Sequence, residues 1–423
     1  MSRAITIPID IPDVEVISTE ITAENHLYIR VESTQKTTRC GVCKGQIACT
    51  FGHGQEIRLR HLPVLGLETY ILVRPKRGQC LGCDHDPTTT QVVSWYVQRS
   101  PHTQAYDEYL LKQLLNSTIA DVSLKEQVGY DAVVGALNRQ IESEVNWDEI
   151  DDIGTIGIDE ISRSKGHKKF SAIITARQAN GKVRILGVLA DRKKKTVKAF
   201  LEQIPERLRA TITHFTTDMW EGYLTAVDEF IAEHDDVTAA LVVDRFHVAQ
   251  HYRDDFDDLR KQELRRLKKE LPPETYHEQC QGLLWPLRKN HATLTSDECQ
   301  RLRRLFALSP ALHQAYTFRE ELTAIFNQHL TVAQAEQRLA AWVRKVQQSG
   351  LDTFDGFIKT LRHHWQYIIT YFDQRITSGF VEGLNNKIKT ITRRCYGLRK
   401  VSSLFQRIWL DLNGKELFSL STT

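Results

Sequence analysis

The stretch from Ile153 to Leu189, IGTIGIDEISRSKGHKKFSAIITARQANGKVRILGVL, decides the fold of the centre of the chain. It contains three apolar runs of strand length, at 156–159, 170–175 and 184–189, and the dipeptide at 180–181, Asn-Gly, is a favoured hairpin turn. The elements predicted downstream are a helix at 196–204, a strand at 214–217, a helix at 223–231 and a strand at 239–243. This order predicts a mixed α/β sheet with flanking helices.

The whole chain of 423 residues is longer than one hydrophobic core usually serves, so we expect two or more domains. Hydrophobic residues make up 41% and charged residues 26%, which excludes a disordered protein. The N-terminus, MSRAITIPIDIPDVEV, lacks the pattern of a signal peptide, and no apolar run approaches the ~18 residues of a membrane span. We therefore expect a soluble cytoplasmic protein without a membrane partner.

The net charge of +3 conceals a strong local segregation of charge. Residues 161–200 contain twelve Lys or Arg and one acid, residues 34–83 contain eight and two, and residues 385–407 contain seven and none. Three basic stretches in different parts of the chain fit a polyanion that contacts several domains. For any single stretch, solvated surface is the alternative.

Residues 1–98 are predicted to form a small β-rich module, because 25–75 alternate apolar and polar positions. Two CxxC pairs lie in it, Cys40 with Cys43 and Cys80 with Cys83. In a reducing compartment such pairs indicate a structural zinc site, provided that a hairpin brings them together. Buried or free cysteines are the alternative. Cys49 and His53 are less plausible ligands, since four sulfurs already close a tetrahedral site.

Residues 99–148 show helical periodicity with a break at Gly129-Tyr130, which is typical of a helix-turn-helix. Its last helix, at about 131–141, would enter a DNA major groove and direct Asn138, Arg139 and Gln140 toward bases or phosphates. A plain helical linker domain is the alternative.

Two aspartates follow apolar strand patterns. Asp159 is expected at the end of one strand, with Glu160 beside it, and Asp218 at the end of another. Carboxylates at the ends of adjacent strands project into one crevice, where ionised groups repel each other unless a cation joins them. With a third oxygen donor they would hold one or two magnesium or manganese ions. The alternative for a single strand-terminal Asp is a capping role.

Glu382 is the candidate third donor. It lies in a helix that begins at about Phe380, where Glu382, Asn386 and Lys389 share one face. A carboxylate, an amide and an ammonium group in this arrangement match a metal, a sugar-phosphate oxygen and a phosphate. Ordinary helix-surface charge is the alternative.

Asp244, in Val242-Val-Asp-Arg-Phe-His247, is a further acid at a strand end. It would bind metal, orient His247 or pair with Arg245. We favour a supporting role for Asp244 and His247 over direct ligation.

The predicted organisation follows from these segments. It comprises the zinc-binding module at 1–98, the helix-turn-helix at 99–148, the catalytic sheet at 149–250 with 373–423, and an all-helical insertion at 251–372 with breaks at Pro272-Pro273, Pro286, Pro310 and Gly350.

Taken together, these segments resemble the DDE transposases of bacterial insertion sequences, specifically the insertion sequence L-three family. The motifs that carry the resemblance are the two cysteine pairs, Gly157-Ile-Asp-Glu160, Thr217-Asp-Met-Trp220, Val243-Asp-Arg-Phe-His-Val248 and Gly379-Phe-Val-Glu-Gly-Leu-Asn385 running into Ile388-Lys389. They span nearly the whole chain in the expected order.

The resemblance implies a ribonuclease H-like core, interrupted by a helical insertion, with Asp159, Asp218 and Glu382 as its catalytic triad. It also implies that the zinc finger and helix-turn-helix recognise terminal inverted repeats. We further expect Lys387, Arg393 and Arg394 to contact DNA. Because two element ends and a target must be handled together, a homodimer or larger synaptic assembly is expected.

Two other functions remain open from the sequence. A nuclease with the same metal core would hydrolyse DNA without joining strands. A zinc and helix-turn-helix regulator would bind DNA with no chemistry, its α/β region serving for assembly.

Overall fold

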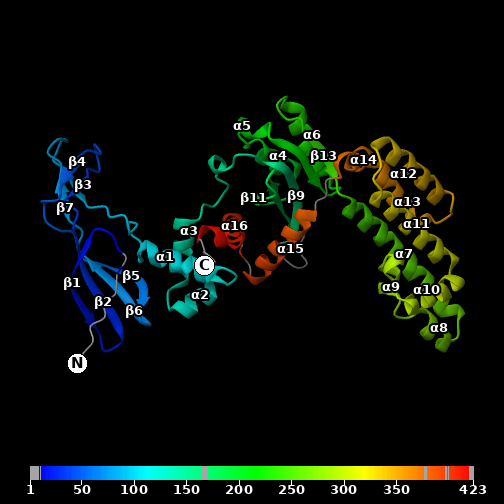
Figure 1. The fold of residues 1–423 in the computed structure, drawn as a ribbon, viewed down its shortest axis with the longest axis horizontal. Helices are drawn as coiled ribbons and strands as arrows, with labels where there is room; N and C mark the ends of the chain where they lie inside the picture. The colour runs from blue at the N-terminus through cyan, green and yellow to red at the C-terminus, as the bar shows by residue number, and fades with distance from the viewer. Residues whose placement is uncertain are drawn as a thin grey trace. The chain divides into compact units, whose positions relative to one another are not determined.

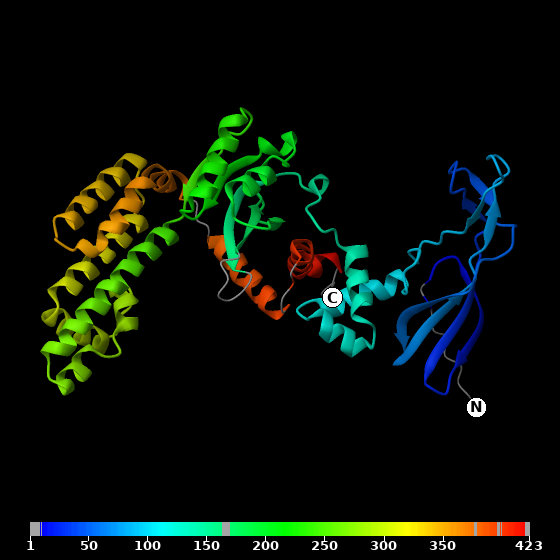
Figure 2. The same cartoon turned by 180° about the vertical axis from the view of Figure 1, so that it is seen from behind.

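The chain folds into two units, one of Glu144–Thr390 and one of Met1–Ser143 with Ile391–Thr423. The computed structural model describes residues 9, 11–162, 170–375, 379–395, 398 and 400–418, and the side chains at 374 and 379–382 are outside this description. Figures 1 and 2 show the elements of both units from two sides.

A five-stranded mixed sheet forms the centre of the Glu144–Thr390 unit, in the order β11-β10-β9-β12-β13. The strands are β9 (Gly154–Ser162), β10 (Phe170–Arg177), β11 (Val183–Val188), β12 (Ile212–Thr217) and β13 (Ala240–Val243). The first three pair antiparallel, and β12 and β13 run parallel to β9. Gly181 has a φ of 83°, which suits the hairpin turn between β10 and β11. The predicted mixed sheet is confirmed.

Helices flank this sheet because their apolar residues recur on one face. In α4 (Lys194–Leu201) the buried residues are Val197, Phe200 and Leu201, spaced i, i+3 and i+4. Helix α4 packs against α6 (Glu221–Glu233), which contacts β12 and β13. The short elements of this region are η1 (Trp147–Glu149) and α5 (Glu206–Arg209).

A helical segment follows β13, as expected from the sequence. Its elements are α7 (Arg245–Glu270), α8 (Pro273–Cys280), α9 (Leu284–Arg288), η2 (His291–Thr293), α10 (Ser296–Leu308), α11 (Pro310–Asn327), α12 (Val332–Gln347), η3 (Asp352–Phe354), α13 (Asp355–His363) and α14 (Trp365–Gln374). Pro273 and Pro310 begin α8 and α11, and Pro286 is the third residue of the short α9, so all three lie in first turns, where proline is tolerated.

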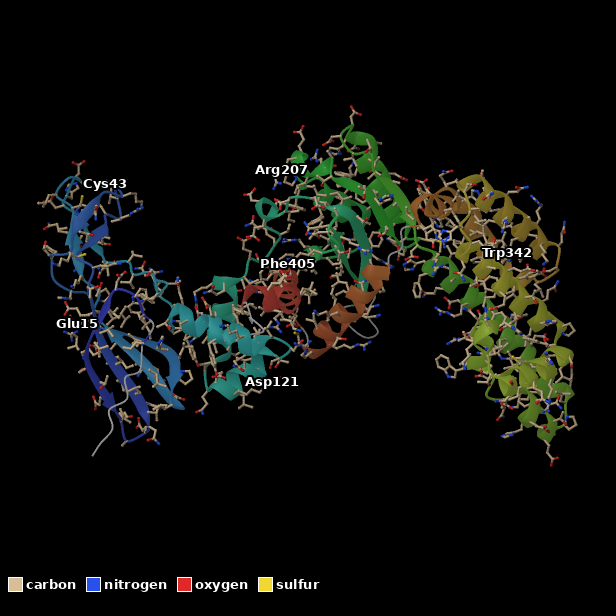
Figure 3. The ribbon with its side chains drawn as sticks, in the orientation of Figure 1. Glu15, Cys43, Asp121, Arg207, Trp342 and Phe405 are labelled. Atoms are coloured by element: carbon tan, nitrogen blue, oxygen red, sulfur yellow. The ribbon has the colours of Figure 1, made fainter. Side chains whose placement is uncertain are left out.

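Two features of this helical segment differ from the predicted boundary at 250/251. Helix α7 starts at Arg245, because Asp244 caps it directly after β13, and it continues to Glu270. The buried residues of the sheet and of the helices also form one continuous hydrophobic cluster. Trp342, labelled in Figure 3, lies in that cluster against Tyr252 and Phe318. The insertion therefore shares its core with the sheet.

A four-stranded sheet opens the other unit, in the order β1-β2-β6-β5. Its strands are β1 (Val14–Ile21), β2 (His26–Ser33), β5 (Ile57–Val64) and β6 (Leu67–Val73), and two hairpins are built from β3 (Thr37–Arg39), β4 (Gln46–Ala48), β7 (Arg77–Gln79) and β8 (Thr88–Thr90). Ile29, Leu59 and Ile71 from alternating positions form its core with Trp95.

Three helices follow this sheet: α1 (Gln104–Leu114), α2 (Ile119–Glu126) and α3 (Tyr130–Gln140). Thr103 and Thr118 cap α1 and α2 through their hydroxyl groups. The connection from α2 to α3 has three residues, of which Gln127 adopts the left-handed conformation with a φ of 52°. Their apolar faces share a second core.

Helix α15 (Gly379–Arg394) spans the boundary between the units, and α16 (Val401–Leu417) follows it. The sequence places residues 373–423 with the catalytic sheet, but α16 packs on α1–α3. Arg407 is 1% exposed and donates to the carbonyls of Leu114 and Ser117 at 3.1 and 3.0 Å. Gln406 donates to Ile141 O at 2.8 Å. These buried bonds hold α16 in the helical core, which its sequence periodicity alone does not indicate.

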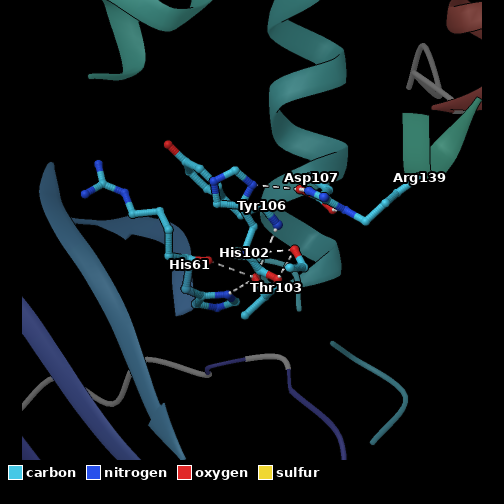
Figure 4. A network of polar contacts seen from close by, with 8 residues as sticks. His61, His102, Thr103, Tyr106, Asp107 and Arg139 are labelled. Atoms are coloured by element: carbon cyan, nitrogen blue, oxygen red, sulfur yellow. Dashed lines mark hydrogen bonds and ion pairs between the residues drawn. The ribbon is translucent and has the colours of Figure 1, made fainter. Parts of the chain in front are cut away.

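A polar network joins the first sheet to the helices (Figure 4). The Asp107 carboxylate, on α1, accepts a hydrogen bond from His102 at 2.8 Å and two from Arg139, on α3, at 2.7 Å each. Thr103 bonds the ring of His61, on β5, at 2.9 Å. Burial alone would raise the pKa of Asp107, but the bonds from His102 and Arg139 lower it below the usual range.

We predict that Asp107→Asn lowers the free energy of unfolding of this unit by about 2–3 kcal/mol, because it leaves a charge-assisted network partly unpaired. Chemical denaturation near pH 7 measures the change. Because the folded-state pKa is lowered, the contribution of Asp107 is present above about pH 4 and disappears as the pH falls further. Glu108→Gln, an exposed charge change on the same helix, is the control and should differ little from wild type. Equal losses in both variants would contradict the role of Asp107.

Candidate active site

Two carboxylates meet where β12 ends beside β9. Thr217, the last residue of β12, pairs in parallel register with Ile158 of β9. The next residues along the two strands are Asp218 and Asp159, so strand pairing alone makes them neighbours. The prediction that Asp159 ends its strand was wrong, because Asp159 lies inside β9, which continues to Ser162. Beyond Ile158 this strand pairs with β10, and β12 has ended there.

A polar pocket of ≈ 590 Å³ opens over these carboxylates. It is lined by residues of the sheet, of α7 and of α15: Asp159, Glu160, Asp218, Met219, Trp220, Phe246, His247, Gln250, His251, Arg253, Asn385, Asn386 and Lys389. The structure thus brings together the sequence-predicted Asp159, Asp218, His247, Asn386 and Lys389 in one place.

Fixed donors orient the two aspartates. The Asp159 carboxylate accepts hydrogen bonds from the backbone N–H of Glu160 at 2.6 Å and from the Asn385 side-chain amide. The Asp218 carboxylate accepts from the backbone N–H of Trp220 at 2.9 Å. Asn385 is 1% exposed, and its side-chain carbonyl has no hydrogen-bond partner among the described residues. A buried acceptor without a donor beside Asp159 suits a cation or its bound water.

Burial raises the pKa of Asp218 to about 6. Asp159 and Glu160 add to this rise by repulsion, while the Trp220 N–H and the nearby His247 oppose it. Burial, with a smaller contribution from repulsion, therefore destabilises ionised Asp218 until a positive charge compensates it.

Arg192 supplies positive charge at the rim of the pocket. Its guanidinium donates to Glu160 at 2.6 Å and stacks over the rings of Trp220, at 3.9 Å, and Phe170, at 4.3 Å. The bond from Arg192 fixes the position of the Glu160 carboxylate. Arg192 also fixes Trp220, whose side chain is 41% exposed beside Asp218.

Asp244 does not line the pocket. It is 2% exposed, and its carboxylate caps α7 by accepting from the N–H of Phe246 at 2.9 Å. This contact fixes the start of the helix that presents His247 to the pocket.

Glu382 lies in α15, but its side chain is outside the described part of the chain. Asn386 and Lys389, its partners on one helix face, both line the pocket.

The residues expected to contact DNA fall into two groups. Asn138, Lys387 and Arg393 are exposed, and Gln140 is half-buried. Arg139 is instead bound to Asp107 by two hydrogen bonds. Arg394 pairs with the buried Asp411 at 3.5 Å. The charges of Arg139 and Arg394 are thus engaged within their own unit, a role that a count of basic residues does not reveal.

A second cavity of ≈ 490 Å³ adjoins the acidic pocket and shares Phe246 and Arg253 with it. Four arginines line it: Arg245, Arg253, Arg288 and Arg319. Two of these arginines, Arg288 and Arg319, already pair with Asp257 and Glu320, so the positive charge of this cavity is partly compensated.

The two cysteine pairs converge in the N-terminal unit. Cys40 and Cys43 lie in the β3–β4 turn, Cys80 and Cys83 in the β7–β8 turn, and β4 contacts β7. The sulfurs of Cys40 and Cys83 are 3.9 Å apart, and those of Cys43 and Cys80 are 3.7 Å apart. Backbone N–H groups of Cys43 and Val42 lower the pKa of Cys40 to about 6. All four ligand atoms can share one metal ion.

The sequence alone did not assign a role to several residues that line the pocket or contact its lining. Gln250 and His251 follow His247 by three and four positions, so helical spacing was the available signal. Asn385 stood in a quoted motif without a role. Arg192 and Phe170 carried no motif signal, because only the fold brings them to Glu160.

An acidic pocket at the ends of parallel strands is typical of enzymes that transfer phosphoryl groups with divalent cations. A family model described as "Transposase", for the DDE transposases of the ISL3 type, matches residues 156–408. The chain belongs to this family. It is therefore a transposase, an enzyme that acts on DNA by cleavage and strand transfer, and the family implies a divalent metal.

Curated relatives agree with this assignment. The transposase for insertion sequence element IS1001 of Bordetella parapertussis is 24% identical over 386 residues, covering 90% of each chain. The transposase for IS1557 of Mycobacterium tuberculosis (strain CDC 1551 / Oshkosh) is 23% identical over 397 residues, covering 89% of this chain and 86% of its own. A chain of the Drosophila P element transposase strand transfer complex matches 76% of this chain and 94% of its own, with 11% identity and a TM-score of 0.40.

Among the described residues, none of the helices is long and apolar enough to cross a membrane.

We predict that Asp218→Asn stabilises the metal-free protein by up to about 3 kcal/mol, the equivalent of raising a pKa from 3.8 to about 6. Because the folded-state pKa is raised, ionised Asp218 lowers stability as the pH passes about 4, and this cost is complete above about 6. Denaturation in EDTA at pH 8 measures the gain. The gain should vanish near pH 3, and exposed Asp235→Asn is the control. A destabilised Asp218→Asn protein at pH 8 would contradict the raised pKa of Asp218.

Proposed function

We propose that this transposase cleaves and joins DNA with Asp159, Asp218 and Glu382 as its catalytic triad. The observation that carries this proposal is the pocket that contains both aspartates together with Asn386 and Lys389 of α15. In a helix, Glu382 precedes these two residues by four and seven positions and shares their face. A third carboxylate on that face would complete an oxygen-rich site.

We propose magnesium or manganese as the catalytic cation, held by these three carboxylates. The donor set fits, since hard cations prefer carboxylate and amide oxygens, and the Asn385 carbonyl beside Asp159 has no partner among the described residues. When bound, such a cation polarises a phosphate and supplies a nucleophile at neutral pH. The protein's share is to hold the carboxylates ionised and in place through Asn385 and the Glu160 and Trp220 N–H groups.

Basic residues around the pocket would position the DNA strand. Lys389 lines the pocket beside the carboxylates, and Arg253 lies at its boundary with the arginine-lined cavity. Their charges oppose the negative field of the acids and would bind phosphates on either side of the cleaved bond. His247 lowers the pKa of Asp218 and so favours its ionised form.

We assign the sheet to the ribonuclease H-like fold. Three antiparallel strands followed by two parallel ones, in the order β11-β10-β9-β12-β13, support this assignment. Under it, the helices from α7 to α14 are the insertion that precedes the glutamate helix α15.

We assign α2 and α3, with their three-residue connection, to a helix-turn-helix that binds the terminal inverted repeats of the element. Exposed Asn138 and half-buried Gln140 on α3 are the candidate DNA contacts of this motif, and Lys387 and Arg393 are separate candidates on α15. Because two ends must be cut and joined, we propose a dimer or larger assembly. We further propose a bacterial origin, as for the curated relatives, and action in the cytoplasm.

We assign zinc to the four cysteines. A tetrahedral site with Zn–S bonds of about 2.3 Å separates its sulfurs by about 3.8 Å. The sulfur separations of 3.6–3.9 Å match this value. Four thiolates leave no open position, so the role of this site is structural.

We predict that Asp159→Asn, Asp218→Asn or Glu382→Gln each lowers cleavage and strand transfer by at least about 10²–10³-fold while end binding persists. Labelled element ends with Mg²⁺ measure cleavage, pre-cut ends measure joining, and a mobility shift measures binding. Asp235→Asn is the control. Wild-type cleavage without joined products would indicate a nuclease, and an Asp159→Asn protein that still joins ends would refute the triad.

A separate prediction concerns the cysteines. Cys43→Ser should reduce bound zinc by one ion per chain and destabilise the N-terminal sheet, because removing one ligand leaves the other three unable to close the site. Elemental analysis and thermal unfolding measure the two effects. The control is Cys49→Ser, a nearby cysteine outside the cluster. Unchanged zinc content in Cys43→Ser would exclude the assignment.

A further inference from the structure

We propose that Glu221, His363 and His364 form a second metal site, distinct from the acidic pocket and from the four cysteines, that takes a transition cation such as Zn²⁺. One ligand atom of each residue lies within 4.8 Å of those of the others. None of the three lines the acidic pocket. A carboxylate with two imidazoles is the donor set that zinc, cobalt and nickel prefer over magnesium.

The local backbone explains how two adjacent histidines face the same point. In a continuous helix, neighbouring side chains diverge by about 100°. Here α13 ends at His363, and His364 caps α14 with φ −100° and ψ 18°, outside the helical range. The two rings consequently lie with their centroids 4.6 Å apart at an interplanar angle of 75°. Glu221, the first residue of α6, faces them, and its carboxylate lies 3.3 Å from Nε2 of His363.

An ion pair between Glu221 and His363 does not account for His364. This residue is 6% exposed, and its Nδ1 is buried without a hydrogen-bond partner among the described residues. A buried imidazole nitrogen without a partner is costly in a folded protein. Coordination uses one imidazole nitrogen, and we assign Nδ1 of His364 to the cation, which would give this nitrogen the polar partner that no described residue supplies.

The spacing of two of the three ligands already suits an ion. Ligands at about 2.0–2.2 Å from a tetrahedral zinc are about 3.3–3.6 Å from one another. The Glu221–His363 separation of 3.3 Å already meets this value. The side chains of Glu221 and His363 are 67% and 64% exposed, so an ion can enter from solvent and a water can complete the coordination.

A cation at this site would connect two parts of the same unit. Glu221 begins α6 only three residues after Asp218, and the histidines lie at the junction of α13 and α14 in the helical insertion. The ion would therefore fasten the insertion to the loop that carries Asp218 and Trp220.

Zinc binding to the full chain tests this proposal. Protein already loaded at the four-cysteine site is dialysed against increasing free Zn²⁺ with millimolar Mg²⁺ present, and bound zinc is counted. Wild type should take up one more ion per chain than Glu221→Gln or His363→Ala, or bind it with a dissociation constant at least about tenfold lower. Exposed His329→Ala is the matched control and should resemble wild type.

Cobalt distinguishes this ion from zinc at the cysteines. The additional Co²⁺ should give a visible spectrum without the intense thiolate charge-transfer band, and His363→Ala should lose it. Both substituted side chains are exposed, so thermal unfolding without added metal should match wild type. Equal metal uptake and equal Co²⁺ spectra in wild type and in correctly folded Glu221→Gln and His363→Ala would overturn the proposal.

Discussion

The parallel pairing of β12 with β9 is the constraint on which the site depends. Its register, Thr217 opposite Ile158, leaves Asp218 and Asp159 side by side at the point where β12 ends. Burial and mutual repulsion then raise the pKa of Asp218 to about 6. The surrounding contacts counter this cost, since the Glu160 and Trp220 N–H groups, the Asn385 amide and His247 all act on one aspartate or the other. The sheet thus keeps together two groups that would otherwise separate, which is the arrangement a cation-dependent transferase requires.

The helical insertion extends the same framework. Because its core is continuous with that of the sheet, α7 leaves β13 as a rigid support, and His247, Gln250 and Arg253 on it reach the pocket. Helix α15 reaches the pocket through Asn385, Asn386 and Lys389. Residues separated by more than 200 positions in the sequence therefore form one site, in which the Asn385 amide of α15 donates directly to the Asp159 carboxylate.

Those parts of the fold and of the site that local chemistry determines could be predicted from the sequence. Strand patterns, the Asn180-Gly181 hairpin, the helices around Gly129 and the cysteine pairs have signals within a few residues. Prediction failed where long-range packing decides. Asp159 was expected at a strand end, but β10 supports β9 for three residues more. Residues 401–417 were expected with the sheet, but Arg407 and Gln406 bind carbonyls of α1 and the residues after α3. The DNA contact of Arg139 stays a prediction, and in the fold its guanidinium donates to Asp107, a partner 32 residues away.

The difference between the basic residues that the fold pairs and those that it leaves exposed has a physical cause. A basic residue in a sequence has no visible partner, so its charge is available in principle to a phosphate. In the folded chain, Arg139 and Arg394 are held by the buried acids Asp107 and Asp411, whereas Lys389 and Arg253 line pockets. Charge that is already compensated within the fold adds little to the attraction of DNA, because binding would have to break a buried pair. The residues that bind DNA are therefore expected among those whose charges the fold leaves exposed. Lys387 and Lys389 of α15 meet that condition, and they lie on or next to the helix face that carries Glu382.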